Sequence, residues 1–340
     1  MIPKKVILDC DPGSDDAIAM MLAMKSNAID LIGVTTVNGN RIVPKTTENA
    51  LRVVQFMKSN VPVYRGCEEP IICNEIPSRK PGLPRVTLND CHGDFLPLPA
   101  AEIQTEKEHA VFYLVKILME SEGDIYVAAV GPLTNIAMAL RIEPKIAGKI
   151  KQLVIMGGGH CGANASPAAE FNFYADPEAA KIVMDSAIPK VILPLDATWR
   201  ACLSEEKCQE LAQLGTPEAK VAAALVQKRI DNLKVNDVSE HNYALRHQAG
   251  TVAGAMLYRY DNHMAPIHDA LAIAYLINEN VVTELADANV DIDIAGGLCD
   301  GRMVADFHNT KKCKAPVTAK VALNSDAGLF TDMLFAALGK

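Results

Sequence analysis

The sequence has no long apolar run and no excess of basic residues. None of its hydrophobic stretches approaches the length of a membrane-spanning helix, and the first nine residues are too short to hold the apolar core of a signal peptide. Its 41 acidic side chains outnumber 33 basic ones, so the formal charge is -8 and no basic stripe is available for a phosphate backbone. We therefore expect a cytoplasmic protein that binds neither membranes nor nucleic acid.

Cysteine pairs and linker-like segments are missing as well. The nine cysteines are scattered, odd in number and without a Cys-x-x-Cys pair, which argues against a disulfide framework and a zinc ribbon. No Ser/Gly-rich linker, charge run or internal repeat divides the chain. With 49% hydrophobic and 22% charged residues the chain can bury a large core. We expect residues 1–340 to form a single domain with reduced thiols.

Short apolar runs alternate with helical patterns along most of the chain, which predicts an α/β fold. We expect a mostly parallel central sheet with helices on both faces, a Rossmann-like open sheet, and a small β-rich C-terminal extension. The expected strands are 6–8, 31–37, 61–64, 125–130, 153–156, 191–195, 290–294 and 317–323. The expected helices are 15–25, 44–58, 109–121, 134–141, 177–186, 217–233, 268–277 and 331–338.

Four carboxylates follow the first expected strand. Asp9, Asp11, Asp15 and Asp16 lie close together in the sequence, at the carboxyl end of a strand, where open α/β sheets bind their ligands. Such a cluster needs protons or a cation unless it faces bulk water, and hard oxygen ligands suit Ca²⁺ or Mg²⁺. A solvated turn that merely places two acids at a helix N-terminus would not explain Asp9 and Asp11. We interpret this turn as a metal site.

Other metal-binding motifs also place aspartates in this way. An EF-hand is excluded because, counting from Asp9, Gly13 and Met20 occupy positions that must supply oxygen ligands. A Mg²⁺-dependent phosphohydrolase of the haloacid dehalogenase type would use Asp9 as nucleophile and Asp11 as acid and base, but it gives the two later aspartates no role. That alternative stays open, as does a calcium-dependent sugar- or nucleoside-binding protein without turnover.

The acidic turn DCDPGSDD at 9–16 resembles the N-terminal fingerprint of the inosine-uridine preferring nucleoside hydrolases. Further segments agree in the same order: TTVNGN at 35–40, GPLTN at 131–135, MGGG at 156–159, EFN at 170–172, DPEAA at 176–180 and HDA at 268–270. The similarity spans about residues 4 to 324. It implies an enzyme that hydrolyses the N-glycosidic bond of ribonucleosides to free base and ribose, in purine and pyrimidine salvage, as a homodimer or homotetramer with bound Ca²⁺.

The resemblance also implies roles for individual residues. The catalytic pair would be Asp11, as the general base, and His268, which would assist departure of the base. The calcium ligands would be Asp11, Asp16, the main-chain carbonyl of Val130, and Asp269. The substrate-binding residues would be Asp15, Asn40, His92, Met156, Asn164, Glu170 and Asn172. Asp15, Asn40 and Asn172 would bind the ribose diol. Asn164 and Glu170 would bind the 5′-hydroxyl.

This chemistry requires a cation, a base and a polar sugar pocket together. An N-glycoside breaks through an oxocarbenium-like sugar cation, so the enzyme must supply a water nucleophile and neutralise the departing base. Calcium that holds both vicinal hydroxyls and the water would orient the reactants. Because calcium is a weak acid, a carboxylate such as Asp11 must take the proton.

The residues directly before His268 indicate the base preference. Purine-specific members of this family sandwich the base between tryptophans, one of them at or before this position, whereas here Pro266 and Ile267 precede the histidine. The one tryptophan, Trp199, follows an expected strand, where it could stack on a base or pack beneath the site. We expect a preference for pyrimidines such as uridine, or a non-specific inosine-uridine type, with base contacts from residues 232–264.

Overall fold

The strands belong to two sheets, and the computed structural model describes residues 2–72, 93–235, 263–308 and 316–340. The strands of the large sheet are β1 (Lys4–Cys10), β2 (Ile29–Thr36), β3 (Val63–Arg65), β4 (Ile125–Ala129), β5 (Ile150–Met156), β6 (Lys190–Leu193), β9 (Val282–Ile292), β10 (Met303–Asp306) and β11 (Ala319–Ser325). β7 (Cys202–Ser204) and β8 (Met264–Pro266) pair antiparallel in a separate small sheet.

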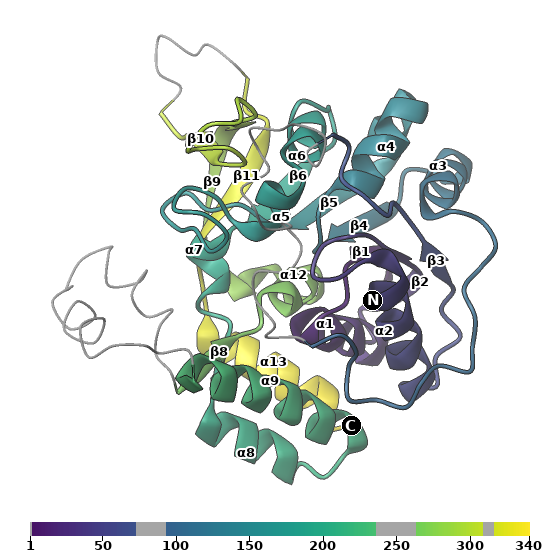
Figure 1. Cartoon of the computed structure of the whole chain (residues 1–340), viewed down its shortest axis with the longest axis vertical. Coiled ribbons are helices and arrows are strands. Elements are labelled where there is room, and N and C mark those ends of the chain that lie inside the picture. Colours follow the sequence, from purple (N-terminus) through teal and green to yellow (C-terminus); the bar gives the residue numbers. More distant parts are fainter. Residues whose placement is uncertain (1, 73–92, 236–262, 309–315) are drawn as a thin grey trace, which may run out of the picture.

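The large sheet has nine strands within the described residues, in the order β10-β9-β11-β6-β5-β4-β1-β2-β3. The strands from β3 to β11 in this order run parallel, whereas β9 is antiparallel to β11 and β10 is antiparallel to β9 (Figure 1). The predicted mostly parallel sheet with a β-rich C-terminal extension is confirmed.

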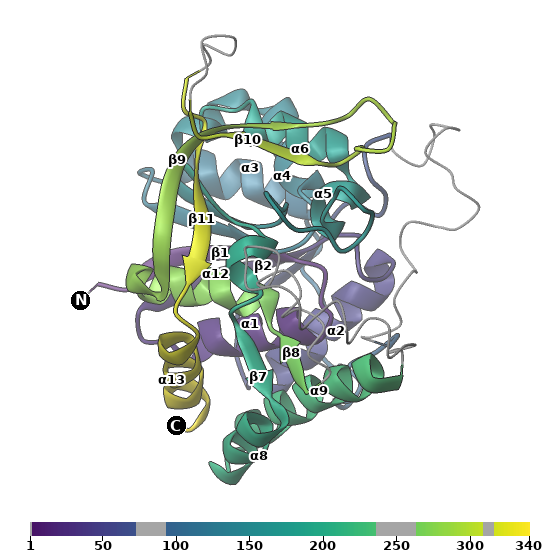
Figure 2. The same ribbon diagram turned by 90° about the vertical axis from the view of Figure 1, so that its left-hand side faces the viewer.

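Helices cover both faces of this sheet (Figure 2). One face carries α3 (Ala110–Glu120), α4 (Thr134–Ile142) and α6 (Pro177–Met184), and the short α5 (Phe171–Ala175) precedes α6. The other face carries α1 (Ser14–Lys25), α2 (Val43–Phe56), α8 (Glu205–Gln213), α9 (Pro217–Val235), α12 (His268–Ile277) and α13 (Ala327–Leu338). The remaining short helices are α7 (Leu195–Thr198), η3 (Pro144–Gly148) and η5 (Glu279–Val281).

The side chains of the central strand β1 face two hydrophobic cores, one on each side of the sheet. Val6, Leu8 and Cys10 face the core on the α1 side, and Ile7 faces the core on the α3 side. All four are fully buried, as expected for a parallel strand with helices on both faces. α1 is buried around most of its circumference because it packs between the sheet and the neighbouring α9, α12 and α13.

Short elements and element ends depart from the sequence prediction. β7, β8, β10, α5 and α8 were not predicted, and the expected strand 290–294 overlaps only the last part of β9. β7 and β8 have three residues each and lie about 60 positions apart in sequence, so only their tertiary pairing makes them strands. Edge strand β10 likewise depends on its partner β9.

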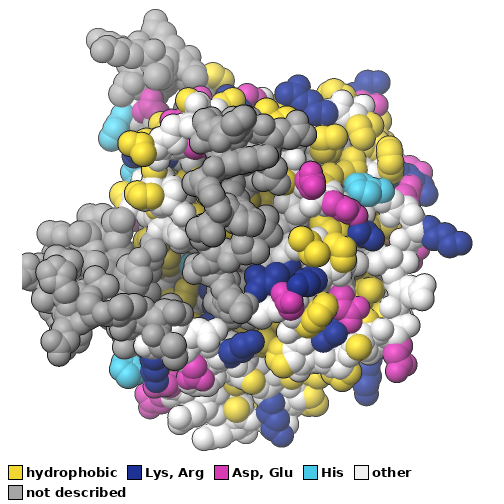
Figure 3. All heavy atoms as spheres, in the orientation of Figure 1, with side chains coloured by type: hydrophobic (Ala, Val, Ile, Leu, Met, Phe, Trp, Pro, Cys, Tyr) yellow, Lys and Arg dark blue, Asp and Glu magenta, His cyan; other side chains and the backbone are white. Residues whose placement is uncertain are grey.

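The surface of the described residues mixes charges of both signs. On the face shown in Figure 3, Lys and Arg side chains alternate with acidic and apolar ones over the described elements. Among the helices of the described ranges, none is long and apolar enough to cross a membrane.

Candidate active site

The acidic turn follows β1, which lies between β4 and β2 in the large sheet. Asp9, next to last in β1, pairs with Thr35 of β2 on one side and Ala129 of β4 on the other. Pro12 and Gly13 then lead directly into α1, where Gly13 is the N-cap. The turn therefore lies at the carboxyl ends of the parallel strands, the position at which such sheets bind ligands.

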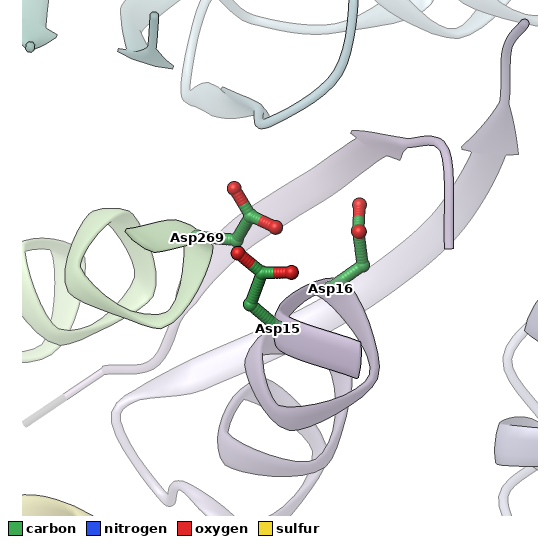
Figure 4. A group of neighbouring side chains, drawn as sticks. All are labelled: Asp15, Asp16 and Asp269. Atoms are coloured by element: carbon green, nitrogen blue, oxygen red, sulfur yellow. The ribbon is translucent and has the colours of Figure 1, made fainter. Parts of the chain in front are cut away.

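Two buried carboxylates of this turn meet a third one from α12. Asp15 and Asp16 are in the first turn of α1, and Asp269 is in the first turn of α12 (Figure 4). One oxygen of each lies within 4.8 Å of the others, and all three side chains are buried. Two helix N-termini thus converge on the cluster, and their partial positive charge favours anions there.

Asp11 is held next to the cluster by main-chain groups. The Asn40 N–H donates to Asp11 Oδ2 at 2.5 Å, and the Asp11 N–H donates to Asp16 Oδ1 at 3.1 Å. A Cβ on Gly39 would lie 2.0 Å from Asp11 Oδ2, and one on Gly131 would lie 2.6 Å from Oδ1. Only glycine permits this approach, so the segments around Gly39 and Gly131 enclose the Asp11 carboxylate.

The electrostatics of the cluster favour a bound cation. Burial, followed by repulsion from neighbouring aspartates, raises the pKa of Asp11 and that of Asp269 well above the ordinary value. The same causes raise the pKa of Asp16 to about 7. Carboxylates so placed must take up protons or share a cation, and buried hard oxygen donors fit a divalent ion such as Ca²⁺. The residues present therefore fit the metal that the resemblance implies.

Asp9 plays a different part from the other acids. It is fully buried, and its Oδ1 accepts hydrogen bonds from Thr35 Oγ1 at 2.6 Å and Asn135 Nδ2 at 2.7 Å. Burial raises the pKa of Asp9 to about 7, although both hydrogen bonds oppose the shift. Asp9 links β1 to β2 and to α4 through these hydrogen bonds, so we interpret it as a structural support of the acidic turn.

The two asparagines expected at the ribose diol contact the predicted metal ligands. Asn40 Nδ2 donates to the Asp11 carbonyl at 3.1 Å and to Asp16 Oδ2 at 3.3 Å. Asn172 Nδ2 donates to the Val130 carbonyl at 2.8 Å and to the Met156 carbonyl at 3.0 Å. The structure therefore brings these residues together at the sheet edge.

Glu170 and Asn164 have structural partners of their own. Glu170 is buried and caps α5: its carboxylate accepts from the N–H groups of Asn172, Phe173 and Gly158. Burial raises the pKa of Glu170 to about 7. The Asn164 Oδ1 accepts from the Phe171 N–H at 2.8 Å. Both residues thus order the 158–173 loop, in addition to any contact with a ligand.

His268 begins α12 directly before Asp269. Its Nδ1 lies 2.8 Å from Thr198 Oγ1, at the end of α7, and its ring is nearly buried. This contact orients the imidazole ring. Thr198 was missed by the sequence analysis, although it follows β6 and so lies at the edge of the sheet where ligands bind.

Trp199 packs against the glycine-rich segment that follows β5. Its side chain is 8% exposed, and a Cβ on Gly162 would lie 2.4 Å from its ring. The interpretation of Trp199 as packing beneath the site fits this contact. His92 and most of the region 232–264, where base contacts were predicted, lie outside the described residues.

Comparison with known proteins identifies the family of the chain. A sequence profile of the inosine-uridine preferring nucleoside hydrolases matches residues 6–332. The chain therefore belongs to this family and is an N-glycosyl hydrolase.

Individual relatives cover nearly the whole chain. The pyrimidine-specific ribonucleoside hydrolase RihB of Escherichia coli O157:H7 is 36% identical over 337 residues, 97% of this chain and 95% of the relative. A plant nucleoside hydrolase, PpNRh1, superposes with a TM-score of 0.82 at 26% identity and 99% coverage of both chains. A purine-preferring ribonucleoside hydrolase from Gardnerella vaginalis gives 0.80 at 25% identity, covering 99% of this chain and 98% of the other.

Proposed function

We propose that this protein is a calcium-dependent ribonucleoside hydrolase that converts a nucleoside and water to free base and ribose. The observation that carries the proposal is the buried group of carboxylates from α1 and α12, next to Asp11 at the end of β1. Calcium bound there would orient the ribose diol and polarise the attacking water. We assign Asp11, Asp16, Asp269 and the Val130 carbonyl as its ligands.

Asp11 acts as the general base in this scheme. Its Oδ2 is held by the Asn40 N–H, and its other oxygen faces Gly131 at close range. Because the Asp11 side chain is held in this way, its carboxylate can accept a proton from the attacking water without a change of rotamer. The proton leaves the water as its oxygen bonds to the anomeric carbon of ribose.

The remaining polar residues hold the sugar and assist the leaving base. Asp15, Asn40 and Asn172 bind the diol, and Asn164 and Glu170 bind the 5′-hydroxyl; Met156 and His92 line the pocket. His268 donates a proton to the departing base, and the contact of its Nδ1 with Thr198 Oγ1 orients the ring. Protonation of the base neutralises the charge that forms as the glycosidic bond breaks.

A preference for pyrimidine nucleosides is supported by two observations. The 36% identical relative is named pyrimidine-specific, and no aromatic side chain directly precedes His268 in this chain. We further propose that residues 1–340 form one domain, that the protein works as a homodimer or homotetramer, and that it is cytoplasmic.

The phosphohydrolase alternative is disfavoured by the position of Asp9. That reaction needs Asp9 as an accessible nucleophile, whereas its side chain is fully buried and bonded to Thr35 and Asn135. These hydrogen bonds tie Asp9 to β2 and α4, whereas a nucleophile has to be free to approach the phosphorus atom.

The decisive experiment is a base-release assay with uridine, cytidine, inosine, adenosine and guanosine, and with 2′-deoxyuridine as a control. We expect uridine and cytidine to react fastest, and the 2′-deoxy compound to react poorly because it lacks one hydroxyl of the diol. Binding of uridine without release of base would identify a binding protein. Release of phosphate from phosphate esters, but of no base from nucleosides, would support the alternative enzyme.

A further inference from the structure

A positive charge from helix α9 reaches the acidic cluster. Arg229 Nη1 lies 2.8 Å from Asp15 Oδ1, and the two side chains are only 13% and 8% exposed. α9 packs against α1, which carries Asp15. Burial of an ion pair costs desolvation free energy, so such a pair is weak evidence for a stabilising role. A buried pair in a binding site therefore suggests a functional role.

The number of charges makes Arg229 more than a local contact. The group formed by Asp15, Asp16 and Asp269, together with the adjacent Asp11, brings four buried carboxylates near one another, and one divalent ion balances only two of them. Arg229 balances a third, and its field also lowers the pKa of Asp269 against the other influences on that group. Asp15 lies within reach of an ion at this site, because one of its oxygens is within 4.8 Å of those of Asp16 and Asp269. The ion pair with Arg229 competes with such an ion for the Asp15 carboxylate.

We propose that Arg229 is a positioning residue that divides the carboxylates between two tasks. By pairing with Asp15 Oδ1 it keeps Asp15 out of the ligand set of the divalent ion and directs Asp15 to a hydroxyl of the sugar. This inference rests on the proposed function. Arg229 thereby sets both the metal affinity of the site and its grip on the ribose diol.

The chain offers a matched control for the packing of these two helices. Lys25 Nζ and Glu218 Oε1 form a second ion pair between α1 and α9, at 2.9 Å, with side chains 21% and 18% exposed. Lys25 is the last residue of α1, at the opposite end of the helix from the cluster. Lys25→Met therefore removes an ion pair between the same helices without changing the charge of the site.

The test compares Arg229→Met, Arg229→Lys and Lys25→Met with the unaltered protein. Calcium affinity is measured on the full chain in calcium buffers at mildly alkaline pH, and KM is measured for uridine. Loss of a nearby positive charge strengthens the attraction for a divalent ion, so Arg229→Met should bind calcium at least about tenfold more tightly. Its KM for uridine should rise at least about tenfold, because Asp15 is drawn to the ion and no longer serves the hydroxyl.

The opposite signs of the two effects identify the role. Arg229→Lys keeps the charge and should restore both quantities in part, and Lys25→Met should leave both unchanged. If Arg229→Met weakens calcium and uridine binding in parallel, or changes neither, the proposal is wrong. Calcium affinity is read without turnover, so a protein that hydrolyses no nucleoside would refute the proposed function, while its calcium affinity would still show whether Arg229 weakens binding of the ion.

Discussion

The acidic cluster and the loop at 158–173 lie at the same edge of the sheet but satisfy their polar groups differently. In the cluster, burial and mutual repulsion raise the pKa values of Asp11, Asp16 and Asp269, so these carboxylates must take up protons or share a cation. In the loop, Glu170 accepts from three backbone N–H groups, and Asn164 accepts from a fourth. Repulsion between like charges dominates the first region, and hydrogen bonds to the main chain order the second.

Removal of calcium should have the largest effect, and it should act on the cluster alone. We expect a chelated protein to retain its fold and lose hydrolysis of uridine, since the diol and the water lose their common anchor. The measurement is elemental analysis, with about one Ca²⁺ per chain expected, together with activity before and after calcium is restored. Full activity in a protein shown to be free of metal would contradict the scheme.

Asp11→Asn should reduce kcat by about 100- to 10,000-fold, the range for loss of a general base. The amide keeps an oxygen for the Asn40 N–H, so circular dichroism and the melting temperature should change little.

Asp9→Asn is the matched comparison for this prediction. It alters the acid that supports the turn from below, so it should lower the melting temperature more than Asp11→Asn and reduce kcat less. The reverse order, with Asp9 more important for turnover, would favour the phosphohydrolase scheme.

Glu170→Ala should affect both activity and stability moderately. Activity toward uridine should fall much more than activity toward 5′-deoxyuridine, because only the former offers a 5′-hydroxyl to this side chain. Loss of the α5 cap should also lower the free energy of unfolding by about 1 to 3 kcal/mol. Equal losses of activity on both substrates would leave Glu170 with its capping role alone.

The pH dependence of stability should differ between metal-free and calcium-loaded protein. Asp9, Asp16 and Glu170 have ordinary pKa values of 3.8, 3.8 and 4.5, and each is raised to about 7 in the folded chain. Between about pH 4 and pH 7 the folded protein therefore binds more protons than the unfolded chain. The free energy of unfolding of the metal-free form should fall as the pH rises through this range. Melting curves at several pH values measure this, and calcium should reduce the slope by replacing the proton on Asp16.

Thr198→Val should have the smallest effect on turnover. It removes the hydroxyl that contacts His268 Nδ1 and keeps the shape of the side chain. We expect a reduction in kcat of about tenfold and a shifted pH profile, with little change in KM. An unchanged pH profile would show that the ring is oriented without Thr198.

The main strands and helices, and the acidic turn, could be predicted from the amino-acid sequence alone. The strands and helices that carry the site have clear patterns, as in β1 and α1, and buried parallel strands need apolar runs. The carboxylates of the turn are neighbours in the chain, and Asp269 follows His268 in a recognisable motif. Local order and composition were enough to predict these features.

Tertiary structure decided which side chains meet across the sheet edge. Thr198 reaches His268 from 70 residues away, and Arg229 reaches Asp15 from a helix with no motif around it. Burial likewise decides how far the pKa values of Asp9 and Glu170 rise, because desolvation depends on everything packed around a group. Such pairings depend on how helices dock on the sheet, and no local pattern in the sequence encodes that.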